Sequence, residues 1–265
     1  MSEDSRARKV TQALNRLETR YGAQDSPASY APLEAFLAAI LMDSIPRSRA
    51  HEALEQLKKR FVDWNEARVS TGKEIAEYCH PVHVSESAGR NVQRALEKVY
   101  AECATLTLDE FKEKNAKEAR EYLATFEGVS HAAVAYAMLY GLQKAAIPVT
   151  KPVLRVAERL GLVEDGCGAE RAGRFLERVV PSARMATFFE TFSMHADEVC
   201  QQKEPKCRRC ATVRLCAFRR NAKSPVKVLS HRGPRAAAHT TPSAGRAKAK
   251  RSTTSVRSRK KRAAK

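Results

Sequence analysis

The chain has 265 residues, of which 43% are hydrophobic, so it can bury one large or two small cores, and a wholly unfolded protein is excluded. Its net charge of +18 is unevenly placed. Residues 221–265 contain 14 Lys and Arg and no acid, which leaves 34 basic against 30 acidic residues, or +4, in residues 1–220. No apolar stretch approaches the ~20 residues of a membrane-spanning helix, and the first residues lack the apolar core of a signal peptide. The sequence predicts a soluble, cytosolic monomer with no membrane partner.

Helical periodicity covers nearly all of residues 5–200, and no run of alternating β-branched residues is long enough to indicate a sheet. Gly and Pro residues fall between the periodic segments or at their first positions, where helices tolerate them. The pattern predicts an all-α body. In chain order we expect helices at about 5–21, 32–43, 47–61, 72–78, 85–103, 108–113, 116–125, 131–143, 151–161, 169–178 and 182–196.

The seven cysteines divide into two groups. Cys79, Cys103 and Cys167 are scattered, and we expect them to be buried as small hydrophobic side chains, as we expect Trp64 to lie in the core. An odd count in a chain without a secretion signal argues against a disulfide framework. The other four cysteines lie within seventeen residues and follow the spacing C-x6-C-x2-C-x5-C: Cys200, Cys207, Cys210 and Cys216.

This spacing favours an iron-sulfur cluster. Structural zinc sites usually combine two short-spaced cysteine pairs, and only one C-x2-C pair is present, so zinc is the alternative. Four thiolates in one continuous loop can enclose a cubane at its corners, which is how 4Fe-4S clusters are held. The predicted cofactor is therefore a 4Fe-4S cluster.

The segment after the cysteines, residues 221–265, has almost no large apolar side chains and cannot offset its own ordering entropy. It is predicted to be a disordered polycation that binds nucleic acid. A solubilising tail, or one that binds a ribosome or a membrane surface, is the alternative.

The cysteine spacing, the hairpin FEGVS and the order of the segments LEAFLAAILMDS, IPVTKPVLRVAERLG and MHADEVC together resemble the endonuclease III-like helix-hairpin-helix (HhH-GPD) DNA glycosylases. His195 matches a histidine found five residues before the first cysteine in that family. The resemblance implies a six-helix barrel lobe over 30–143 and an iron-sulfur lobe formed by 1–29 and 144–220, with a groove for double-stranded DNA between them. Such a protein would associate with the nucleoid, or lie in the nucleus of a eukaryote.

Within this resemblance the hairpin Gly128, Val129 and Ser130 is expected to hold a DNA phosphate. A helix that begins after a glycine turn exposes unpaired amides, and its positive dipole end favours an anion. Ser130 replaces the second glycine of the family pattern, but it retains an amide and adds a hydroxyl. We expect further phosphate contacts from Lys151 and from the basic residues in the cysteine loop: Lys203, Lys206, Arg208 and Arg209.

Both residues that the family uses for chemistry are replaced. The lysine nucleophile of the bifunctional members corresponds to Ala132, and the aspartate eighteen residues later corresponds to Thr150. A neutral threonine followed by Lys151 loses the negative charge that stabilises a developing cation. Ser44 stands near a family glutamine that fills the gap left by a flipped base, and it is too short to do so.

The sequence therefore predicts a DNA-binding relative of the base-excision-repair glycosylases that has lost glycosylase and lyase activity. Two alternatives remain open. The first is an active glycosylase with relocated catalytic residues, for which the candidates are Lys151, Lys144, His131 and Glu127. The second is a DNA-binding protein whose cluster senses redox state.

Overall fold

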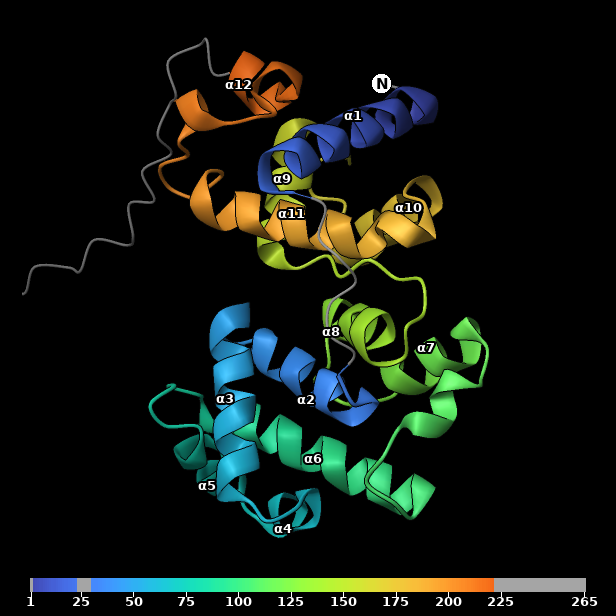
Figure 1. The fold of residues 1–265 in the computed structure, drawn as a ribbon, viewed down its shortest axis with the longest axis vertical. Coiled ribbons are helices and arrows are strands. Elements are labelled where there is room, and N and C mark those ends of the chain that lie inside the picture. The colour runs from blue at the N-terminus through green and yellow to red at the C-terminus, as the bar shows by residue number, and fades with distance from the viewer. Residues whose placement is uncertain (1, 23–29, 222–265) are drawn as a thin grey trace, which may run out of the picture. The chain divides into compact units, whose positions relative to one another are not determined.

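The computed structural model describes residues 2–22 and 30–221, and within these ranges the chain forms helices and no strand (Figure 1). The all-α prediction is confirmed. The α-helices are α1 (Glu3–Tyr21), α2 (Pro32–Met42), α3 (Arg47–Arg60), α4 (Trp64–Val69), α5 (Gly72–Tyr78), α6 (Glu86–Cys103), α7 (Ala116–Ala124), α8 (His131–Tyr136), α9 (Lys151–Leu160), α10 (Ala169–Val179), α11 (Met185–Glu198) and α12 (Ala217–Asn221). The short elements are the 3-10 helices η1 (Asp109–Lys112), η3 (Ser182–Arg184), η4 (Cys207–Arg209) and η5 (Val213–Leu215), and the π-helical turn η2 (Ala137–Gly141).

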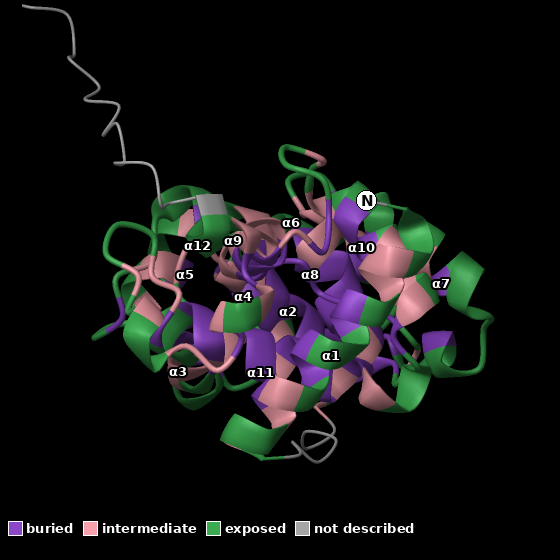
Figure 2. Cartoon of the chain, turned by 90° about the horizontal axis from the view of Figure 1, so that it is seen from above, coloured by how far each residue is buried: buried purple, intermediate pink, exposed green. Residues whose placement is uncertain are grey.

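The first hydrophobic core lies among α2 to α8, which we call the α2–α8 lobe. Helix α2 is apolar on all sides and is buried along most of its length, as a helix at the centre of a lobe must be. Its residues Phe36, Leu37 and Ile40 pack into this core together with side chains of α3, α6 and α8. Figure 2 shows the buried residues gathered on α2, α8 and α11.

The second core lies among α1, α9, α10 and α11, which together with the following loop and α12 form the cysteine lobe. Three phenylalanines of α11, Phe188, Phe189 and Phe192, are completely or almost completely buried here, and the first and last of these rings stack 3.9 Å apart. Helices α9 and α10 are strongly amphipathic, with Val153, Val156 or Leu176 on the buried face and charged residues outside. Together with the buried face of α1, these helices enclose the second core.

Helices α2 and α8 belong to both cores. Ala35 and Ala39 of α2 contact the second core, and α8 with η2 directs Val134 and Met138 to the first core but Tyr136 and Tyr140 to the second. The hairpin at the start of α8 is therefore held by both lobes.

Every predicted helix is present in some form, and most ends lie within two residues of the predicted ones. The exceptions are 131–143, described below, and 182–196, whose first turn is the 3-10 helix η3; the segment 108–113 forms the 3-10 helix η1. Two short helices, α4 and α12, were not predicted. The segment 131–143 was expected to be one regular helix, which is wrong beyond Tyr136: the chain widens into η2, where Gly141 lies so close to Pro32 of α2 that a side chain would not fit.

Of the three cysteines expected in the core, Cys79 is fully buried, whereas that prediction is wrong for Cys103 and Cys167. Cys103 ends α6 and Cys167 lies in the loop before α10, so both are partly exposed. Trp64 is partly buried against the first core. The predicted tail, 221–265, lies outside the described residues apart from its first residue, which ends α12. The lobe boundaries 30–143 and 144–220 stay a prediction. No helix in the described ranges has both the length and the apolar character needed to cross a bilayer.

Candidate nucleic-acid interface

The hairpin between α7 and α8 is a tight turn that needs its glycine. Gly128 has a φ of +75°, a left-handed conformation that side chains disfavour, and a Cβ atom there would lie 3.0 Å from the amide nitrogen of Asn91. Ser130 caps α8, because its hydroxyl accepts a hydrogen bond from the amide of Ala133 at 3.1 Å. The next two amides, those of His131 and Ala132, donate to no described residue. The turn thus presents unpaired donors at a helix start.

A carboxylate that the sequence analysis did not single out lies against this turn. Asp43, the residue after α2, accepts hydrogen bonds from the Ser130 amide (3.1 Å) and from the Ser130 hydroxyl (2.5 Å). Asp43 is exposed at the surface, but partial desolvation of its carboxyl raises the pKa of Asp43, while the Ser130 hydrogen bonds and the charge of Lys151 act in the opposite direction. The two Ser130 groups expected to face a phosphate therefore both donate to a carboxylate in this structure.

The two residues predicted to stand at the family's catalytic positions, Ala132 and Thr150, lie at the starts of two helices. Ala132 is in the first turn of α8 and is partly exposed. Thr150 precedes α9, and its side chain forms no capping hydrogen bond. Lys151 is the exposed first residue of α9, close enough to Asp43 to lower that carboxyl's pKa. Ala132, Thr150 and Lys151 thus supply a methyl group, a hydroxyl and an ammonium group, respectively. The acidic residue near Lys151 is Asp43.

The other substitutes that the sequence suggested are engaged elsewhere. Lys144 donates to the carbonyl oxygen of Lys112 at 2.8 Å, and Glu127 forms an exposed ion pair with Arg94 at 3.1 Å. The His131 ring packs against Gly173 of α10, with its Nδ1 buried and without a hydrogen-bond partner. Burial and the charge of Arg120 lower the pKa of His131.

The four predicted ligands lie on the loop after α11, and none of them forms a disulfide with a described residue. In the described residues, no three Cys, His, Asp or Glu side chains are placed to hold a metal ion. Burial raises the pKa of the Cys216 thiol, and Cys210, Cys200 and Cys207 are near enough to raise it further. Two 3-10 turns fold the loop, and the Lys206 amide donates to the carbonyl oxygen of Val199 at 2.8 Å to close its first arm. One continuous segment thus gathers four sulfur atoms.

Two arginines of α9 hold this loop in place. The Arg159 guanidinium donates to the carbonyl oxygens of Gln201 (2.7 Å) and Gln202 (2.8 Å) and to the Cys200 sulfur (3.5 Å). Arg155 donates to the Cys200 carbonyl oxygen at 3.0 Å. The sequence analysis did not identify these residues. Their four-residue spacing on one helical face was the available signal, but charged i, i+4 pairs are common on solvent-facing helices.

His195 links the loop to α11. Its Nε2 lies 3.4 Å from the Cys210 sulfur, and its Nδ1 lies 3.3 Å from the Tyr21 hydroxyl. The side chain is 1% exposed, and burial, aided by the charge of Arg20, lowers the pKa of His195 to about 4. A neutral imidazole therefore contacts a thiol at the centre of the loop.

The basic residues predicted to touch DNA are all exposed on this loop. Lys203, Lys206, Arg208 and Arg209 form no ion pair with any residue in the described ranges. By contrast, most exposed arginines on α3 and α6 are paired with a glutamate, as in Arg49–Glu52 and Arg90–Glu86. The loop therefore presents uncompensated positive charge to solvent.

Comparison with known proteins agrees with this arrangement. No protein-family model matches the chain. The DNA glycosylase/AP lyase ROS1 of Arabidopsis thaliana is 29% identical over 102 residues, and endonuclease III of Buchnera aphidicola is 28% identical over 100 residues. Each match covers 38% of this chain, but only 7% of the plant protein and 46% of the bacterial one. The chain thus matches less than half the length of these relatives.

Solved structures match over most of the chain. A trapped endonuclease III–DNA covalent intermediate superimposes with a TM-score of 0.68 and 15% identity, covering 84% of this chain and 99% of that one. A thermostable thymine-DNA glycosylase gives a TM-score of 0.65 at 16% identity, covering 81% and 98%. A 3-methyladenine DNA glycosylase of H. pylori gives 0.57 at 15% identity, covering 75% and 98%. The predicted resemblance is confirmed at the level of the fold.

Proposed function

We propose that this chain, which has the fold of endonuclease III and related helix-hairpin-helix DNA glycosylases, is a 4Fe-4S protein that binds double-stranded DNA without excising bases. The observation that carries the proposal is the combination of a glycine hairpin and a four-thiol loop with Ala132 and Thr150 at the two catalytic positions. DNA would contact the hairpin, Lys151 and the exposed cations of the cysteine loop.

Charge and comparison support the DNA-binding part of the proposal. Four unpaired cations on one loop are suited to backbone phosphates, because each phosphate neutralised releases a counterion. Among the solved structures that superimpose on this chain are covalent and non-covalent complexes of endonuclease III with DNA. Asp43 would have to leave Ser130, or become protonated, before a phosphate could take its place.

The spacing of the thiols supports an iron-sulfur cluster over a single zinc ion. Structural zinc sites usually combine two short-spaced cysteine pairs, whereas this loop has a single C-x2-C pair, Cys207 and Cys210. Cys200, Cys207 and Cys210 each affect the pKa of Cys216, although in the described residues no three Cys, His, Asp or Glu side chains are placed to hold a metal ion. Cys200, Cys207, Cys210 and Cys216 would hold the cluster, which when bound would cross-link the loop.

The lost chemistry follows from the side chains present. Ala132 has no nucleophile to attack the sugar, and Thr150 has no negative charge to stabilise a sugar cation. Lys151 adds a positive charge next to that position, which opposes the departure of the base. We therefore expect the protein to bind DNA without excising a base or cleaving the strand.

A turnover experiment tests this proposal. The purified, iron-loaded protein is incubated with duplexes that carry uracil, oxidised pyrimidines, 8-oxoguanine mispairs or abasic sites. We expect gel-shift binding, but no released base and no borohydride-trapped adduct above the level of a no-protein control. Multiple turnover that disappears in Lys151→Ala would overturn the non-catalytic proposal, and the absence of any duplex binding would overturn the DNA-binding one.

Asp43 favours a second candidate, an active glycosylase with a relocated carboxylate. Asp43 lies at the hairpin beside Lys151, and partial desolvation raises the pKa of its carboxyl. It would accept a proton from water as the water attacks the sugar carbon that the base leaves. The same assay separates the candidates, because Asp43→Asn would then abolish base release while leaving binding in place.

A further inference from the structure

A basic pocket lies on the cysteine lobe, between α1 and the last described helix, α12. We call it the α1–α12 pocket. Its volume is about 360 Å³, and α1 lines one side with residues spaced by three and four positions, which face the same way on a helix. The other side comes from η5 and α12. Its lining residues are Ser5, Arg8, Lys9, Gln12, Arg214, Leu215 and Arg220.

The lining of this pocket has four cations and no acid. Arg8, Arg214 and Arg220 are exposed and form no ion pair with any described residue. Lys9 is 8% exposed and donates to the carbonyl oxygen of Leu160 at the end of α9. Burial lowers the pKa of Lys9, and the charge of Arg220 lowers it further. The positive charges are therefore close enough to repel one another, a cost that a bound anion would remove.

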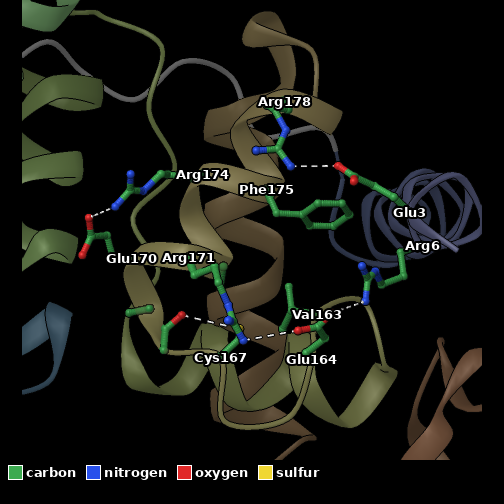
Figure 3. Close-up of a pocket in the computed structure, with 13 residues that line it drawn as sticks. Glu3, Arg6, Val163, Glu164, Cys167, Glu170, Arg171, Arg174, Phe175 and Arg178 are labelled. Carbon is green, nitrogen blue, oxygen red and sulfur yellow. Dashed lines mark hydrogen bonds and ion pairs between the residues drawn. The ribbon is translucent and has the colours of Figure 1, made fainter. Parts of the chain in front are cut away.

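The opposite face of α1 offers a direct comparison. The α1–α10 pocket, about 630 Å³ in volume, also contains four arginines, yet carboxylates neutralise each of them (Figure 3). The ion pairs are Arg6–Glu164 (3.0 Å), Arg171–Glu164 (3.2 Å), Arg178–Glu3 (2.8 Å) and Arg174–Glu170. Both arginine-rich pockets are lined by α1. Of these two, only the α1–α12 pocket has arginines that form no ion pair with a described residue.

We propose that the α1–α12 pocket binds backbone phosphates of a nucleic-acid segment outside the groove between the lobes. Arginine forks match phosphate geometry, and Ser5 and Gln12 add neutral hydrogen-bonding groups to the wall. In Figure 1, α1 and α12 lie at the end of the cysteine lobe that is farther from the α2–α8 lobe. The pocket is thus separate from the hairpin of α8.

The sequence favours a polymer over a small anion as the ligand. Helix α12 runs directly into residues 222–265, which contain 14 Lys and Arg and no acid. A polyanion can neutralise this additional charge of the chain as well as the pocket, whereas a single phosphate ion in the pocket cannot. The inference rests on the proposed function, since it assumes that the chain binds nucleic acid, and it adds a second contact region to the hairpin and loop.

The salt dependence of duplex binding tests the pocket. The full chain and the double variant Arg214→Ala/Arg220→Ala are compared on one long duplex between 50 and 200 mM salt. Each phosphate contact contributes about 0.9 to the slope of log K against log salt, so losing one contact reduces the affinity ratio over this range by about 3.5-fold. We expect the double variant to lose one to two contacts, and Arg214→Lys/Arg220→Lys to keep them.

The matched control is Arg171→Ala/Arg174→Ala in the α1–α10 pocket, which removes two exposed but paired arginines and should leave the slope unchanged. An unchanged slope in Arg214→Ala/Arg220→Ala, or an equal loss in the control, overturns the second site but leaves the proposed function standing. Failure of the parent to bind any duplex overturns both. Thermal melting confirms that each variant folds.

Inorganic phosphate distinguishes a free anion from a nucleic-acid backbone. At equal ionic strength we expect phosphate and chloride to give the parent the same melting temperature. A specific stabilisation by phosphate that Arg214→Ala/Arg220→Ala abolishes, with no change in its duplex slope, would assign the pocket to a free anion and overturn the nucleic-acid proposal.

Discussion

At the scale of single residues, the hairpin contains a glycine turn at Gly128 and also contacts an acidic residue, Asp43. Asp43 holds both the amide and the hydroxyl of Ser130, the donors nearest the predicted phosphate site. A carboxylate and a phosphate compete for the same donors, because both are anions with strong acceptor oxygens. If the chain binds DNA as proposed, Asp43 would therefore oppose DNA at the hairpin, while the cations of the cysteine loop would attract it.

Neutralising Asp43 should strengthen DNA binding. Asp43→Asn keeps the side-chain shape and one acceptor oxygen but removes the charge, and we expect about 1 kcal/mol, roughly fivefold in Kd, from the lost repulsion. In the parent protein, protonation of the Asp43 carboxylate removes the same negative charge. Since partial desolvation raises the pKa of Asp43, affinity should increase as the pH falls through that raised value, and the increase should be absent in Asp43→Asn. Fluorescence anisotropy at constant ionic strength measures both effects.

Asp165→Asn is the control, because Asp165 is exposed and forms no hydrogen bond with a described residue. It should change neither the affinity nor its pH dependence. Weaker binding by Asp43→Asn would show that Asp43 supports the DNA-binding geometry of the hairpin instead of competing with DNA.

At the scale of secondary-structure elements, α9 connects the features of the candidate site. Its first residue is Lys151, beside Asp43, and its middle turns place Arg155 and Arg159 against the cysteine loop. The carbonyl oxygen of its last residue, Leu160, accepts a hydrogen bond from Lys9 of α1. The ten-residue helix α9 thus reaches the hairpin region through Lys151 and the cysteine loop through Arg155 and Arg159.

Removing the Arg159 guanidinium should loosen the cysteine loop. Arg159→Ala leaves the carbonyl groups of Gln201 and Gln202 without these donors, a loss of roughly 2–3 kcal/mol for two charge-assisted hydrogen bonds that are partly exposed. Arg159→Lys should be nearly as harmful, because an ammonium cannot reproduce the fork. We expect fewer iron atoms per purified chain and faster tryptic cleavage after Lys203 and Lys206. Arg219→Ala, which alters an exposed side chain with no hydrogen bond to a described residue, should match the parent in both measurements; a parent-like Arg159→Ala would contradict the anchoring role.

The sequence was sufficient to predict the elements but not the contacts between them. Helix periodicity and breakers located nearly every helix, and the cysteine spacing located the loop, because both are local patterns. Asp43 could not be predicted, since 87 residues separate it from Ser130 and nothing in ILMDSIP indicates which way it points. The role of Arg159 was also hidden, because an i, i+4 pair of arginines is equally typical of a solvated helix face. Helix α4 was missed because its six polar and apolar residues are too few to show a period.

At the scale of the whole described body, the two cores are joined by a mostly buried ion pair. Arg47 of α3 forms a bidentate contact with Glu190 of α11, and the Tyr140 hydroxyl donates to the same carboxylate at 2.6 Å. The Arg47 guanidinium also lies 5.4–5.9 Å from the ring centres of Tyr136, Tyr140 and Phe189. Removing one partner of such a pair is costly, because it leaves the other charge desolvated and without its counter-charge.

We predict that substituting Arg47 and Glu190 together costs less stability than substituting Arg47 alone. Arg47→Met keeps most of the side-chain volume but leaves Glu190, whose side chain is 13% exposed, without its counter-charge. Because Arg47 is itself 30% exposed, we expect a loss of about 2–3 kcal/mol, somewhat below that of a fully buried pair. Adding Glu190→Gln removes the stranded charge and keeps an acceptor for Tyr140, so Arg47→Met/Glu190→Gln should recover to within about 1 kcal/mol of the parent. Denaturant unfolding of the parent, both single variants and the double variant gives the coupling energy directly. If the two losses simply add, the pair is not the electrostatic link between the cores, and the aromatic packing of Tyr136, Tyr140 and Phe189 holds them together instead.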